Sequence, residues 1–207
     1  MNRIIFRSPR ILDFWTGIIL LSLGISLNIK AGLGVSPFDA LLVGLSMHVG
    51  LTVGSWEILL ALIMIFLNAV LIRQKPEFKG LLTALATGLC IDTWLWVIEH
   101  WLQVGHLSNF IYFIVGMFVS GWGTAMYLRA RFARIPVDHL MVIIQLLTKK
   151  SVMYSRTLIY IVFLVLSFLF QGPIGIGTVL TVCFGGAILH FFMAQLNRNN
   201  IITAQKS

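Results

Sequence analysis

Two similar stretches of the chain decide its fold: GISLNIKAGLGVSPFDAL, residues 24–41, and GTAMYLRARFARIPVDHL, residues 123–140. Aligned without a gap, they share a glycine, an alanine, a Pro-x-Asp sequence and a leucine, at Gly24/Gly123, Ala31/Ala130, Pro37/Pro136, Asp39/Asp138 and Leu41/Leu140. After a small shift of register, Gly80, Gly88 and Ile91 also fall on Gly177, Gly185 and Ile188. Such self-similarity indicates an internal duplication. We therefore predict two membrane repeats, residues 11–100 and 108–196.

The chain around these stretches is too hydrophobic for a water-soluble protein. Of its 207 residues, 58% are hydrophobic and 11% are charged, a balance that polar surface cannot cover in water. Long apolar runs recur, each near the ~20 residues that cross a ~30 Å hydrocarbon core. We predict an all-α polytopic membrane protein with about six transmembrane helices, at Ile11 to Ile29, Ser55 to Ile72, Leu81 to Ile98, Asn109 to Leu128, Arg156 to Phe170 and Thr178 to Gln195.

Each repeat also contains a short helix that begins at its proline. Ser36 suits the N-cap, Pro37 the first helical position, and Asp39 the first turn near the positive end of the helix dipole. Pro136 and Asp138 repeat this pattern without a side-chain cap. Residues 37–48 and 136–147 span roughly 18 Å at 1.5 Å per residue, too short to cross the membrane. We predict two re-entrant or half-spanning helices.

The basic residues test this arrangement, because cytoplasmic loops of membrane proteins carry an excess of lysine and arginine. If the short helices re-enter, each repeat crosses three times and the two repeats have opposite orientations, which is an internal inverted repeat. Only Lys30 is then external. Both termini, residues 1–10 and 197–207, are predicted to be cytoplasmic, together with the basic positions Arg3, Arg7, Arg10, Arg73, Lys75, Lys79, Arg129, Arg131, Arg134, Lys149, Lys150, Arg156, Arg198 and Lys206. This sorting accounts for the formal charge of +8 without a nucleic-acid partner.

The short helices admit two interpretations. In one, their starts meet near the membrane midplane and form a small-solute, ion or proton site, as in inverted-repeat transporters. In the other, the carboxylates are helix caps that touch no ligand. The candidate site residues are Ser36, Pro37, Asp39, Asp92, Pro136 and Asp138.

Three further charged residues lie within or beside apolar runs. Asp92 lies within one and needs a partner or water, either as a proton relay or in a structural hydrogen bond. Glu57 and Arg156 hold matching positions of the two repeats, near helix starts. We interpret both as stabilising helix termini rather than as a gate.

Enzymatic chemistry has no visible residues to carry it. No G-x-S-x-G, G-x-G-x-x-G, P-loop or H-E-x-x-H pattern occurs, and such patterns mark nucleophile, nucleotide and zinc sites. His48, His100 and His106 form no i,i+4 pair and have no carboxylate cluster beside them. We predict no catalytic residue, no metal site and no cofactor.

Several motifs together resemble those of a bacterial family. The segment Gly32-Leu-Gly-Val-Ser-Pro-Phe-Asp39, the second Pro-x-Asp138 and Gly175-Ile-Gly-Thr178 resemble the YczE-like membrane proteins, which are related to the wider YitT group, over nearly the whole chain. The resemblance implies a multi-helix fold in the bacterial cytoplasmic membrane and supplies no substrate. This chain departs from the family in Arg131-Phe-Ala-Arg-Ile-Pro136, which is basic and bulky, and in having no glutamate after Arg156.

A small secondary transporter or permease is the function that these features favour, because paired broken helices in an inverted repeat suit alternating access. Its expected partners are the lipid bilayer and a small molecule or ion. A non-transporting scaffold or accessory protein is the alternative, an intramembrane enzyme is a third, and homodimerisation is left open.

Overall fold

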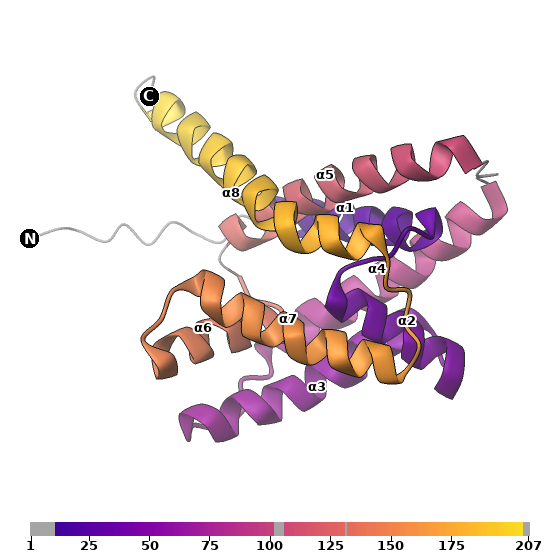
Figure 1. The fold of residues 1–207 in the computed structure, drawn as a ribbon. Coiled ribbons are helices and arrows are strands. Elements are labelled where there is room, and N and C mark those ends of the chain that lie inside the picture. Colours follow the sequence, from indigo (N-terminus) through magenta and orange to yellow (C-terminus); the bar gives the residue numbers. More distant parts are fainter. Residues whose placement is uncertain (1–10, 102–105, 131, 205–207) are drawn as a thin grey trace, which may run out of the picture.

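The computed structural model describes the backbone of residues 11–101, 106–130 and 132–204, and their side chains except those of residues 106–108, 152–153 and 197–204. The described residues form eight α-helices (Figure 1): α1 (Ile11–Ala31), α2 (Pro37–Val49), α3 (Val53–Ile72), α4 (Lys79–Trp101), α5 (His106–Ala130), α6 (Pro136–Thr148), α7 (Val152–Leu169) and α8 (Ile176–Ala204). The all-α prediction is confirmed.

Five helices contain apolar segments long enough to cross a membrane: Ile11–Ala31, Val53–Ile72, Lys79–Trp101, Asn109–Ala130 and Ile176–Leu196. The run expected at 156–170 corresponds to α7, which starts earlier, at Val152, and has 18 residues in all. Its described apolar part is among the shorter helices, with α2 and α6. The structure therefore supports five long spans, one fewer than the six expected. The segment expected as a tail from residue 197 continues α8 to Ala204, and residues 1–10 and 205–207 lie outside the described part.

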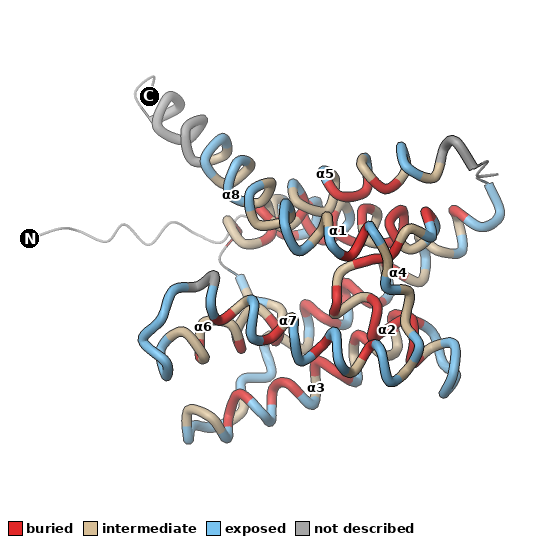
Figure 2. The backbone as a smooth tube through the Cα atoms, in the orientation of Figure 1, coloured by how far each residue is buried: buried red, intermediate tan, exposed pale blue. Residues whose placement is uncertain are grey.

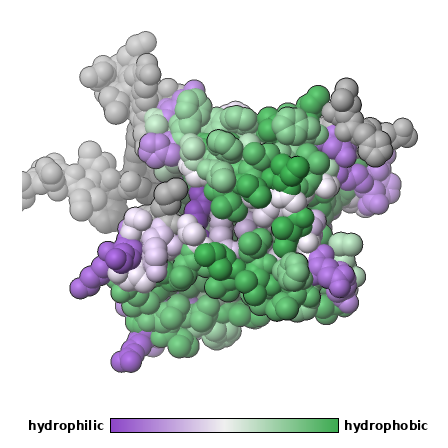
Figure 3. Space-filling view, viewed as in Figure 1, coloured by the Kyte–Doolittle hydropathy of each residue, from purple (hydrophilic) through white to green (hydrophobic). Residues whose placement is uncertain are grey.

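Hydrophobic side chains face outward, as in proteins whose solvent is lipid. Phe168 on α7 is 76% exposed, and Ile111 on α5 and Val179 on α8 are each more than half exposed. Figure 2 shows buried backbone on the inner sides of the helices and exposed backbone on the outer side of α7 and α8. On the face drawn in Figure 3, hydrophobic residues form an upper and a lower region with a paler strip between them, and hydrophilic residues gather toward the left and right ends.

The centre of the fold is the pair α1 and α5, which approach each other through glycines. A β-carbon at Gly24 would lie 2.3 Å from the Ser120 nitrogen, and one at Gly123 would lie 2.3 Å from the Leu21 nitrogen. Real β-carbons do not come that close to backbone, so only glycine permits this spacing. In a membrane, burying apolar side chains between helices gains little because lipid tails are equally apolar. Helices therefore associate through close van der Waals packing, which small residues permit.

Around this pair, α4 packs on α1 and α8 packs on α5. The remaining helices, α2, α3, α6 and α7, form a second group, visible below α1, α5 and α8 in Figure 1. Within it, α2 packs on α7 and α3, and α6 packs on α3 and α7. One further contact, between α3 and α4, joins the two groups closely, since a β-carbon at Gly54 would lie 2.1 Å from the Gly88 oxygen.

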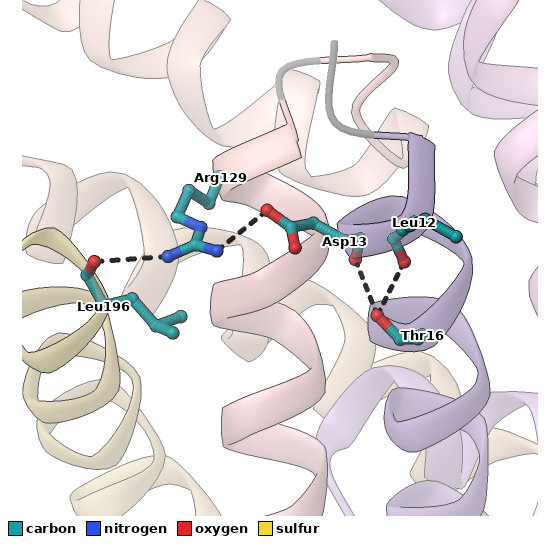
Figure 4. A network of polar contacts seen from close by, with 5 residues as sticks. All are labelled: Leu12, Asp13, Thr16, Arg129 and Leu196. Carbon is teal, nitrogen blue, oxygen red and sulfur yellow. Dashed lines mark hydrogen bonds and ion pairs between the residues drawn. The ribbon is translucent and has the colours of Figure 1, made fainter. Parts of the chain in front are cut away.

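An ion pair ties three helices together at one end of the molecule (Figure 4). The Arg129 guanidinium near the end of α5 donates to the Asp13 carboxylate at the start of α1, at 2.8 Å. It also donates to the Leu196 carbonyl of α8, at 3.2 Å. The start of α1 and the ends of α5 and α8 therefore lie at the same end.

Candidate functional site

The first short helix starts with the cap chemistry that its sequence predicts. The Ser36 hydroxyl accepts a hydrogen bond from the Asp39 backbone N–H at 3.2 Å and donates one to the Asp39 carboxylate at 2.6 Å. Pro37 follows Ser36 and is buried. The local sequence therefore fixes the helix start and holds the Asp39 carboxylate beside it.

The second short helix starts without a side-chain cap, as its sequence predicts. Ile135 stands at the N-cap and makes no such hydrogen bond. The Asp138 carboxylate instead accepts a short hydrogen bond from the Tyr127 hydroxyl of α5. Because Tyr127 is only 2% exposed, this contact places Asp138 in the interior.

Both helix starts line one cavity of about 180 Å³. Ser36, Asp39 and Phe38 come from the first repeat, and Ile135, Val137 and Asp138 come from the second. One water molecule needs roughly 10–15 Å³ of such volume, so this cavity has room for a small solute. The arrangement is the one expected of a shared site, whereas binding itself stays a prediction.

Two more charged side chains reach this cavity, Glu57 from α3 and Arg156 from α7. Sequence reasoning treated both as helix termini and missed that they line the same cavity. Their matching positions in the two predicted repeats were the available signal, because equivalent positions of an inverted repeat lie around the same axis.

Glu57 is only 3% exposed and makes no hydrogen bond or ion pair with any described residue. It lies near enough to Asp39 and Asp138 to interact electrostatically with both. A buried carboxylate without a partner is costly. Among the charged side chains of the cavity, Glu57 is therefore the one that no described side chain or backbone group stabilises.

Arg156 is held by an aromatic neighbour. Its guanidinium donates to the Tyr160 hydroxyl at 2.9 Å and lies 4.9 Å from the centre of that ring. It extends from α7 toward α8, where a β-carbon at Gly186 would lie 2.9 Å from its Nη1 atom. Among the described side chains, it forms no ion pair with Glu57, Asp39 or Asp138.

One side of the cavity is open between helices. Among the residues whose side chains are described, α3 packs closely along α4, but α7 and α8 do not pack along each other. The Arg156 side chain crosses the space between them. In Figure 3, paler and more polar surface lies between the two hydrophobic regions that α8 and α7 form in this view.

Asp92 lies outside this cavity. Its carboxylate accepts hydrogen bonds from the Gly54 N–H at 2.8 Å and from the Thr52 hydroxyl at 2.6 Å, at the start of α3. Asp92 on α4 therefore caps a neighbouring helix, which matches its structural interpretation and separates it from Asp39 and Asp138.

Pro136 belongs to a second cavity, of about 290 Å³, between the end of α3 and the starts of α4 and α6. Its carbonyl accepts a hydrogen bond from the Asn68 side chain at 3.0 Å. Lys75, Lys79 and Arg134 also line this cavity and are exposed. It contains none of the three predicted aspartates.

No cluster of His, Cys, Asp and Glu side chains suited to a metal ion occurs among the residues that the structure describes. The polar centre is instead a cavity of carboxylates, hydroxyls, aromatic rings and one guanidinium.

Apolar outer faces around such a centre define a multi-pass membrane protein. The chain belongs to the family described as a family of unknown function, DUF6198, which it matches over residues 8–194. It is 54% identical to the uncharacterized protein YyaS of Bacillus subtilis over 184 residues, 88% of this chain and 92% of the relative. It is 32% identical to the uncharacterized membrane protein YczE of the same organism over 183 residues, 88% of this chain and 84% of the relative.

A Haemophilus influenzae uncharacterized protein is 28% identical over 182 residues, 86% of this chain and 81% of the relative. No solved structure matches the chain. The expected resemblance to YczE-like proteins is confirmed.

Proposed function

We propose that the protein is a small secondary transporter of the bacterial cytoplasmic membrane, with its solute site in the central cavity. One observation carries this proposal: the two Pro-initiated helix starts, distant in sequence, bring Asp39 and Asp138 to the same cavity. Transporters built from inverted repeats bind their solutes at such paired helix breaks. In this proposal the cavity binds and releases a solute without changing it, so the protein is not an enzyme.

An inverted repeat of three plus three crossings is part of the proposal, with α7 as the sixth crossing. The 18 residues of α7 extend about 27 Å at 1.5 Å per residue, close to the ~30 Å core.

Helix contacts support the repeat because most occur twice in matching form. The contact between α1 and α4 matches that between α5 and α8. Likewise, the α2–α3 contact matches α6–α7, and the α2–α7 contact matches α6–α3. The loop before each short helix also meets the start of the last helix of the other repeat. Gly177 donates its N–H to the Leu33 oxygen at 2.7 Å, and Thr83 donates its hydroxyl to the Ala133 oxygen at 3.2 Å.

The proposed orientation places the Asp13–Arg129 end in the cytoplasm, with both termini. At the opposite end, His48 of α2 lies 3.2 Å from the Gln171 side chain, in the turn between α7 and α8. A cysteine-accessibility assay in intact cells tests this orientation. Label should reach a cysteine at exposed Met47 from outside and should not reach one at Lys75.

A membrane scaffold is the second candidate, favoured by the hydrogen bonds that make Asp39 part of a helix cap. Reconstitution separates the two functions. Purified protein in liposomes is given a mixed metabolite pool, and mass spectrometry measures what accumulates.

We expect accumulation by the wild type and its loss in Asp39→Asn and Asp138→Asn, both of which should remain folded. The matched control is Asp92→Asn, which lies outside the cavity and should lower stability while folded protein still accumulates solute. If no solute accumulates and the Asp39 and Asp138 variants only melt earlier, the transporter proposal is wrong and the aspartates are caps.

A further inference from the structure

We infer that the central cavity binds a small organic cation, whose ammonium or guanidinium group is held by Glu57 with Asp39 and Asp138 beside it. This inference rests on the proposed function in taking the same cavity as the solute site, and it adds the chemical class of the solute.

The charges around the cavity are unbalanced. Three carboxylates, Asp39, Glu57 and Asp138, line it together with one guanidinium, that of Arg156. The side chains therefore supply more potential negative charge than positive charge. In a cavity between apolar helices such an excess attracts a cation and opposes an anion.

Hydrogen bonding singles out Glu57 as the group that lacks a partner. The Asp39 carboxylate is bonded to Ser36, the Asp138 carboxylate to Tyr127, and the Arg156 guanidinium to Tyr160. Glu57 is buried to the same degree as the core and has no donor among the described residues. A ligand with N–H donors supplies both the missing hydrogen bonds and the opposing charge.

Aromatic rings indicate an organic ligand. Phe38 of α2, Tyr127 of α5 and Tyr160 of α7 line the cavity from three different helices. Aromatic faces attract ammonium and guanidinium groups and also cover their alkyl portions. Calcium and magnesium ions take oxygen ligands and would leave these rings unused.

The volume limits the size of the cation. A cavity of about 180 Å³ exceeds the requirement of one water molecule about tenfold. A short alkyl amine or guanidine fits this space, whereas a lipid or a peptide does not.

Binding to purified protein in detergent tests the inference without requiring transport. The probes are ethylammonium, butylammonium, hexylammonium and butylguanidinium, with butanol and butyrate as neutral and anionic analogues and sodium chloride as a metal-ion control. Thermal unfolding is measured at constant ionic strength, and isothermal titration gives the dissociation constants.

We expect saturable stabilisation by at least one amine or guanidine, with a dissociation constant at least tenfold lower than those of butanol and butyrate. Glu57→Gln should weaken binding at least tenfold and should itself remain folded. The control Glu77→Gln, an exposed position of the loop before α4, should bind as the wild type does. No binding of any organic cation, tighter binding of butyrate, binding of sodium alone, or unchanged binding by the Glu57 variant would each overturn the inference.

The same experiments distinguish this inference from the proposed function. If cation binding depends on Glu57 but no solute is taken up into liposomes, the proposed transport function is wrong and the inferred cation site is supported. If only anions or neutral solutes are taken up, the proposed transport function is supported and the inferred cation site is wrong.

Discussion

Replacing Glu57 by glutamine is expected to stabilise the protein while it removes the proposed binding function. Glu57 is 3% exposed and has no hydrogen-bonding partner among the described residues. An unpaired buried carboxylate costs several kcal/mol. On membrane-insertion scales an ionisable side chain within a spanning helix costs about 2.5–3.5 kcal/mol.

Glutamine avoids this cost, but its own buried amide would lack hydrogen-bonding partners, which destabilises the folded state by about 1–2 kcal/mol. The net gain in the free energy of unfolding is therefore about 2 kcal/mol. Reversible unfolding in mixed detergent micelles at pH 7, followed by circular dichroism, measures it. Glu77→Gln should change stability by less than about 0.5 kcal/mol, because that side chain is exposed. A Glu57→Gln protein that is less stable than the wild type by 1 kcal/mol or more would refute the reasoning, since Glu57 would then have a structural partner.

Four other substitutions, with Asp13→Asn for comparison, test the helix packing, the cap of α3 and the Asp13–Arg129 ion pair, each by the same unfolding assay. Gly24→Ala should cost about 2 kcal/mol or more because its β-carbon would meet backbone atoms of α5. Gly121→Ala should cost less because its β-carbon would meet only side-chain atoms, the nearest being a methyl of Ile188; equal losses would contradict the proposed α1–α5 spacing. Asp92→Ala should cost about 2 kcal/mol through the lost cap of α3, and a neutral result would show that the cap contributes nothing. Arg129→Ala should cost about 1–2 kcal/mol by releasing Asp13 and the α8 carbonyl, and the reasoning fails if the Asp13→Asn protein loses more than the Arg129 variant does.

Much of the fold could be predicted from the sequence because lipid imposes simple rules. Apolar length located the long helices to within a few residues, and proline with its neighbouring aspartate placed the starts of α2 and α6 correctly. The start of α7 was harder to predict, since Ser155 and Arg156 interrupt its apolar sequence and its cap at Ser151 carries no hydrophobic signal. The extension of α8 to Ala204 was missed because polar residues end the apolar run before the helix ends.

The candidate site was only partly predictable. Helix-start chemistry identified Asp39 and Asp138, but whether a carboxylate near a helix start faces a cavity or only caps the helix depends on its neighbours in space. Asp92 shows this limit, because its partners Thr52 and Gly54 lie on another helix. Glu57 and Arg156 show the converse, since their positions beside helix starts hid their shared cavity.

If the protein is the proposed inverted-repeat transporter, the unequal packing of its two halves has a kinetic meaning. With α3 and α4 in close contact and α7 and α8 apart, the molecule is asymmetric about the axis that would relate its halves. If the repeats exchange conformations, α7 closes on α8 while α3 leaves α4, and the cavity becomes accessible by the opposite route. The Gly54–Gly88 contact then acts as a latch whose strength sets the rate of exchange, so that a bulkier residue there would hold the protein in one of its two states.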